Sequence, residues 1–193
     1  MPDLLPPSIP ASQIGRAASQ VGMSGLLGGT LFGRLALHPA VTEISDSSER
    51  GKVINAAWSR YGAINSLSLL AVVGGWLGAR ADEARDANLS PRERRLARSK
   101  DVLVAACALN GLATMVEGIR FSKSAPEGAV PLADGDHVAP EATSAQARLK
   151  RRVDLLGRAS LVTNLALVSV DAALSQENFR RPPARRMLSR LRR

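Results

Sequence analysis

The sequence has little that metal or redox chemistry could use. Cys107 is the only cysteine among the 193 residues, and His38 and His137 are the only histidines. A single cysteine cannot form an intramolecular disulfide, and these few ligands lack the spacing of zinc, haem or two-metal sites. The sequence also lacks a glycine-rich phosphate loop and a Ser-His-Asp pattern. We therefore expect neither a metal ion nor a cofactor.

Aromatic side chains are equally scarce, at 3% of the chain, although 45% of the residues are hydrophobic. The apolar content comes from Ala, Leu and Val, with many glycines, which favours closely packed helices over a sheet. Nucleic-acid binding is not expected, because no aromatic platform is available for stacking bases. The composition predicts an all-α protein.

Charge is missing from four stretches of the chain: residues 17–33, 61–79, 102–116 and 159–170. About 20 apolar residues span a bilayer, so the second stretch is long enough and the others need flanking residues whose long side chains snorkel. We predict a four-helix transmembrane bundle with helices at about 17–38, 55–79, 91–121 and 146–176. A soluble helical bundle is the alternative, but residues 61–79 lack the charged face that a water-exposed helix of this length normally has.

The remaining segments divide the chain further. Ser90, Pro91 and Glu93 have the spacing of a helix start, with a cap, a first-turn proline and a capping-box glutamate. Residues 122–144 contain Pro, Gly, Asp and Ser without periodicity, which predicts a flexible loop. We expect residues 1–16 to be disordered, residues 17–176 to form the membrane domain, and residues 177–193 to form a basic tail.

The distribution of basic residues predicts the orientation. The last fifteen residues hold seven arginines and no acid. The two termini and the second connector together carry fifteen Lys and Arg, against eleven in the first and third connectors. The positive-inside rule then places both termini in the cytoplasm, in the inner or plasma membrane, with the tail near anionic lipid headgroups.

Glycine spacing predicts close helix contacts. Gly25, Gly29 and Gly33 form two overlapping small-xxx-small steps in the first helix. Such steps let backbones approach closely in lipid. They could also serve as a surface on which a second copy of the chain packs.

Antiparallel alternation places several polar residues in the same leaflet. Ionisable residues in a membrane usually face the bundle interior or a cavity, so we treat this group as a candidate binding site. Its members are Arg34, His38, Asn65, Glu117 and Arg158. Glu117 could pair with Arg34 or Arg158, and the two arginines could clamp an anion. A structural ion pair, or separate side chains snorkelling to headgroups, is the simpler alternative.

Three further polar residues have expected structural roles. Asn110 and Asn164 lie near the middle of their helices, where an amide bridge between them would satisfy both side chains. Asp171 lies towards the opposite leaflet and could meet Arg80 or the tail.

A glycine-rich first helix ends at His38-Pro39, and the second helix begins near Arg60-Tyr61-Gly62. This layout, over about the first 80 residues, resembles small four-helix bacterial membrane proteins of unknown function, some of them described as anthrone-oxygenase-like. The resemblance implies a four-helix membrane fold and transfers no residue role.

Three functions are compatible with these patterns. The first is a membrane bundle that acts by interaction or by binding a small or lipid-like ligand between its helices. The second is a cofactor-free, oxygenase-like membrane enzyme that uses Arg34, His38, Asn65 and Glu117. The third is a soluble bundle whose basic tail binds an acidic partner. The sequence leaves open whether the protein is an enzyme.

Overall fold

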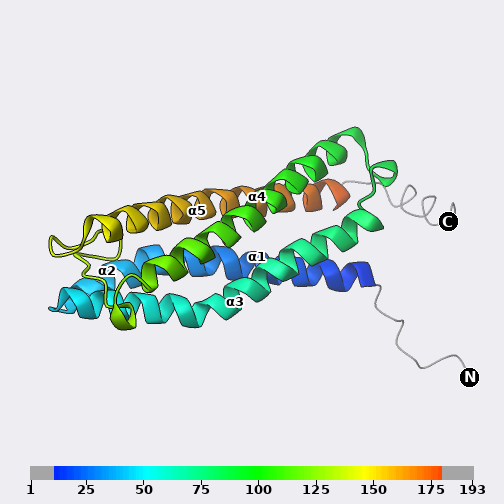
Figure 1. Cartoon of the computed structure of the whole chain (residues 1–193). Coiled ribbons are helices and arrows are strands. Elements are labelled where there is room, and N and C mark those ends of the chain that lie inside the picture. Colours follow the sequence, from blue (N-terminus) through cyan, green and yellow to red (C-terminus); the bar gives the residue numbers. More distant parts are fainter. Residues whose placement is uncertain (1–10, 180–193) are drawn as a thin grey trace, which may run out of the picture.

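The computed structural model describes residues 11–179 as an antiparallel helical bundle (Figure 1). Its long helices are α1 (Ala11–Phe32), α3 (Ser47–Ala81), α4 (Pro91–Ser122) and α5 (Ser144–Phe179). A π-helical turn, Gly33–Leu37, joins α1 to the short α2 (His38–Ala40), and 3-10 turns lie at Val41–Glu43, Asp86–Asn88 and Pro126–Gly128. The prediction of an all-α fold is confirmed. The predicted basic tail is described only as far as Phe179, because residues 180–193 lie outside the described residues.

Alternating helix directions give the bundle two distinct ends. Residues 41–46 and 123–143 connect helices at one end, which we call the loop end (Figure 1). The connector 82–90 lies at the other end, together with the start of α1 and the end of α5, and we call this the terminal end. Residues far apart in sequence therefore meet at each end.

Caps explain where two helices begin. At α4 the capping box is present: the Glu93 amide donates to Ser90 Oγ at 3.3 Å, and the Ser90 amide donates to Glu93 Oε2 at 2.7 Å. Asp46 caps α3 by accepting from the Glu49 amide at 2.8 Å, so α3 begins well before the predicted residue 55. Helix α1 begins at Ala11, so residues 11–16 of the segment predicted to be disordered are helical, and residues 1–10 lie outside the described residues.

Three helices, α3, α4 and residues 144–177 of α5, are long and apolar enough to cross a membrane. Helix α1 is not among them within the described residues, although a span was predicted there. Its stretch 17–33 contains five glycines and four polar residues, which lower its mean hydropathy.

Between the two ends the bundle exposes an apolar belt. Exposed members on α3 include Leu67, Leu70 and Leu77, and α4 contributes Leu109 and Leu112. A helix in water normally turns charged residues outward and apolar residues inward. Here the outward faces of the central turns are apolar.

Small residues bring α1 and α3 together. A Cβ atom on Gly25 would overlap Ser68 Oγ of α3, and one on Gly29 or Gly33 would overlap Tyr61 or Trp58. The three glycines therefore make room for α3 of the same chain. Their use as a surface for a second copy stays a prediction.

The connector 123–143 is folded, which corrects the prediction of a flexible loop. Val130 and Leu132 are fully buried in a small core with Phe121, and Leu132 forms an antiparallel bridge with Val138. Arg50 of α3 donates to the carbonyl of Ala133 at 2.6 Å. The two buried apolar side chains anchor a segment whose surrounding residues are mostly polar.

Candidate functional site

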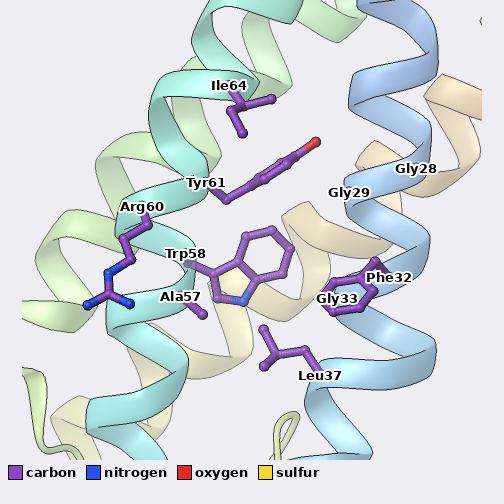
Figure 2. Close-up of a pocket in the computed structure, with 10 residues that line it drawn as sticks. All are labelled: Gly28, Gly29, Phe32, Gly33, Leu37, Ala57, Trp58, Arg60, Tyr61 and Ile64. Atoms are coloured by element: carbon purple, nitrogen blue, oxygen red, sulfur yellow. The ribbon is translucent and has the colours of Figure 1, made fainter.

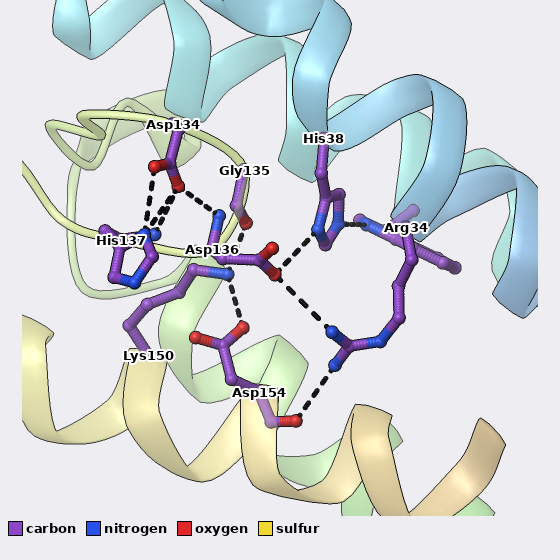
Figure 3. Close-up of polar contacts among 9 residues, drawn as sticks. Arg34, His38, Asp134, Gly135, Asp136, His137, Lys150 and Asp154 are labelled. Atoms are coloured by element: carbon purple, nitrogen blue, oxygen red, sulfur yellow. Dashed lines mark hydrogen bonds and ion pairs between the residues drawn. The ribbon is translucent and has the colours of Figure 1, made fainter. Parts of the chain in front are cut away.

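A polar cluster lies at the loop end, where the connector meets α2 and α5 (Figure 3). Asp136 of the connector lies between two residues of the predicted site: its Oδ1 is 3.0 Å from His38 Nδ1 and 3.8 Å from an Arg34 nitrogen. Arg34 also donates to the carbonyl of Asp154 at 3.1 Å. The connector thus supplies the carboxylate that brings Arg34 and His38 together.

Two residues of α5, Lys150 and Asp154, complete the cluster (Figure 3). Lys150 Nζ donates to the Gly135 carbonyl at 2.6 Å and contacts Asp154 Oδ1 at 2.8 Å. Lys150 is almost fully buried. A buried ammonium needs such partners, since an unpaired charge in the interior is costly. These contacts fasten the connector to the bundle.

Both ring nitrogens of His38 are engaged. Trp58 Nε1 lies 3.4 Å from His38 Nε2, and an indole nitrogen can only donate, so Nε2 must accept. The neutral ring then carries its hydrogen on Nδ1 and donates it to Asp136. Burial lowers the pKa of His38, which the hydrogen bond to Asp136 opposes only in part. The geometry therefore favours a neutral imidazole.

Arg34 lies in the π-helical turn, and His38 directly follows it. Pro39 has no amide hydrogen, and its ring crowds the carbonyl four residues earlier, so the preceding turn widens. Arg34 and His38 are four residues apart, so both side chains leave this segment on the same face. Turns of this kind are frequent at functional sites.

The other predicted members do not join the cluster. Glu117 pairs with Arg120 at 2.7 Å and approaches Arg152 at 3.9 Å. Asn65 is half-buried on α3, and Arg158 is exposed on α5. The sequence reasoning did not predict the direction of these side chains around each helix.

Sequence reasoning missed Asp136, Lys150 and Asp154. The spacing of Lys150 and Asp154, four residues apart at the start of a helix, is a signal for an ion pair. No comparable signal marked Asp136, because its segment was taken as a flexible loop.

The predicted bridge between Asn110 and Asn164 is not formed. Asn110 donates to Ser160 Oγ at 2.6 Å and to the Leu156 carbonyl at 3.1 Å. Asn164 instead accepts from Cys107 Sγ at 3.3 Å. Each amide therefore joins α4 and α5 through a different partner.

At the terminal end, Asp171 pairs with Lys100 of α4 and not with Arg80. The Lys100 ammonium also lies 4.1 Å above the Trp76 ring. Arg80 pairs with Asp101 at 3.1 Å. The buried Lys100–Asp171 pair is thus enclosed within the bundle, and the tail residues 180–193 lie outside the described part of the chain.

An apolar groove runs along the contact of α1 and α3, and Figure 2 labels the ten residues that line it. Its volume is about 500 Å³. Leu37 and Ala57 lie at its loop end, and Gly28 and Ile64 lie deeper in the belt. Trp58 projects from α3 towards α1, so the ring that donates to His38 also forms part of the groove wall.

No known family model, curated protein sequence or solved structure matches this chain. The resemblance to small bacterial membrane proteins therefore stays a prediction. Within residues 11–179, no group of three or more His, Cys, Asp or Glu side chains could hold a metal ion.

Proposed function

We propose that the chain is a membrane-embedded four-helix bundle that holds the apolar part of a lipid-like ligand in the groove between α1 and α3. The observation that carries this proposal is the position of the groove. Its deep end, at Gly28 and Ile64, lies in the apolar belt, and Trp58 of its wall donates to His38 of the polar cluster. A groove with this polarity gradient suits a molecule that has an apolar chain and a polar head.

The volume and rigidity of the groove support the same function. At about 500 Å³ it falls within the range of small-molecule sites. Two hydrogen bonds hold its aromatic walls, from Trp58 to His38 and from the Tyr61 hydroxyl to the Gly25 carbonyl at 2.5 Å. A wall that is already ordered loses little entropy when a ligand binds.

Pairing of the charged residues that flank the short spans supports a membrane location. Residues 102–116 and 159–170 are short for a bilayer, but Lys100 and Asp171 beyond them face each other inside the bundle. Their pairing leaves apolar side chains such as Val102 facing outward. This lengthens the surface that can contact lipid. We propose the inner or plasma membrane, with both termini in the cytoplasm, from the bias in basic residues.

The alternatives have less support. An oxygenase-like enzyme that used His38 as a base would need a free ring nitrogen, and both nitrogens have partners. A soluble bundle would leave the apolar belt exposed to water, at a cost of about 25 cal/mol for each Å².

Two measurements test the proposal. The protein should remain in the membrane fraction after carbonate extraction, and its recovery in the soluble fraction would refute the membrane location. For the groove, lipids with brominated chains should quench the fluorescence of Trp58, assigned by comparison with Trp58→Phe. Gly28→Leu should reduce this quenching, because a Cβ on Gly28 meets open space and the leucine side chain would fill the groove.

Gly78→Leu is the matched control, since Gly78 also has open space around it but does not line the groove. Both substitutions replace a helical glycine by a better helix former, so their effects on helix stability should be similar. Equal quenching in the wild type, Gly28→Leu and Gly78→Leu would refute ligand binding in the groove.

A further inference from the structure

Arg60 is the charged side chain at the groove. Of the residues that line it, the others are glycine or carry apolar or aromatic side chains. Arg60 is exposed and lies directly before residues 61–79, the uncharged stretch of α3. It therefore stands at the level where a lipid headgroup would meet the apolar belt.

The positive charge of Arg60 is not neutralised by a neighbour. Within residues 11–179, Arg60 forms no ion pair, whereas Arg34 and Arg80 each contact a carboxylate. In Figure 2 its side chain extends from α3 on the side away from α1, at the rim and not across the groove floor. This leaves the groove free for an apolar chain and the guanidinium free for an anion.

From this arrangement we propose that the groove selects an anionic lipid of the surrounding bilayer, with one acyl chain beside Gly28 and Ile64 and the headgroup at Arg60. This inference rests on the proposed lipid-binding function and adds the ligand's charge. A guanidinium binds a phosphate through two parallel hydrogen bonds, so it offers directional recognition as well as charge.

The α3 face has the length for such a contact. Ala57 and Ile64 are seven residues apart, which corresponds to about 10 Å along a helix. Arg60 lies between them, one turn from Ile64, so a chain held against Ile64 can keep its headgroup at the guanidinium. The groove thus accommodates the upper part of one acyl chain.

The test compares phosphatidylglycerol with phosphatidylcholine, both with the same brominated chains, in bilayers that contain the full-length protein. We expect Trp58 quenching to require about fivefold less phosphatidylglycerol than phosphatidylcholine, the factor that one basic residue near a surface provides. Arg60→Gln should remove this preference. Because both headgroups carry a phosphate, the substitution should weaken quenching by both lipids, and quenching by phosphatidylglycerol more strongly.

Arg158→Gln is the matched control. Arg158 is exposed at the same end of the bundle but lies on α5 and does not line the groove. Its substitution should leave the preference intact. An equal loss in Arg158→Gln and Arg60→Gln would mean that general surface charge attracts the lipid, and would overturn the inference.

Gly28→Leu separates this inference from the proposed function. If the groove binds lipid without regard to charge, Gly28→Leu reduces quenching by both lipids and Arg60→Gln changes nothing, so only the inference fails. If Gly28→Leu has no effect on either lipid, both the inference and the proposed function fail. Conversion of a dimer to a monomer by Gly28→Leu, with no lipid effect, would assign the groove to a second copy of the chain and also overturn the inference.

Discussion

Acidification should destabilise the protein through His38. The native structure favours the neutral ring, because Trp58 donates to Nε2 and burial lowers the pKa of the imidazole. The unfolded chain has no such constraint, so its His38 takes up a proton near the usual pKa of about 6.5. Below that pH the unfolded state binds more protons than the native state, and stability falls as the pH falls.

The surroundings of His38 determine the size of the effect. The contact with Asp136 raises the pKa of His38, whereas the positive charges of Lys150 and Arg34 lower it. If the native ring stays neutral, lowering the pH from about 7.5 to about 5.5 removes about 1.4 kcal/mol of unfolding free energy. If the native ring begins to protonate in this pH range, the loss of unfolding free energy is smaller.

The assay is unfolding of the detergent-solubilised protein at several pH values, followed by tryptophan fluorescence. His38→Gln should lower stability at neutral pH and remove most of the pH dependence in this range. His137→Gln is the control: His137 is exposed, and its contact with Asp134 raises its pKa, so its contribution has the opposite sign. An unchanged pH dependence in His38→Gln would refute the reasoning.

Three further predictions concern packing and capping. Lys100→Met should destabilise the protein by about 3 kcal/mol in the same unfolding assay, because the Asp171 carboxylate would remain inside the bundle without its partner. The double variant Lys100→Met with Asp171→Leu should recover most of this loss. Gly51→Ala should make the connector 123–143 more sensitive to limited proteolysis, since a Cβ there overlaps a connector carbonyl, whereas Gly62→Ala has open space and should not. Ser90→Ala should lower the unfolding free energy by about 1 kcal/mol through loss of the α4 cap, and no change would argue against that cap.

The candidate site was only partly predictable from the sequence. Uncharged stretches and antiparallel alternation placed Arg34 and His38 in one group, and both residues contact Asp136 at the loop end. The same reasoning failed for Glu117, whose side chain pairs with Arg120. Depth follows from counting residues along a helix, whereas direction depends on how each helix is rotated against its neighbours.

Local chemistry made some features predictable from sequence alone. The start of α4 at Pro91 follows from the Ser90 cap and Glu93, because these groups bond within one turn. The all-α fold follows from composition and from the long uncharged stretches.

Only the tertiary structure decided the site. In the connector 123–143, Val130 and Leu132 are fully buried, and their docking on distant helices delivers Asp136 to His38. The groove likewise depends on how close α1 and α3 approach, which the glycines allow but do not specify. The sequence by itself determined the helices, the two polar ends and the uncharged middle, because those depend on neighbours along the chain. The tertiary structure decided which side chains pair, because these pairs join residues more than 70 positions apart in the sequence.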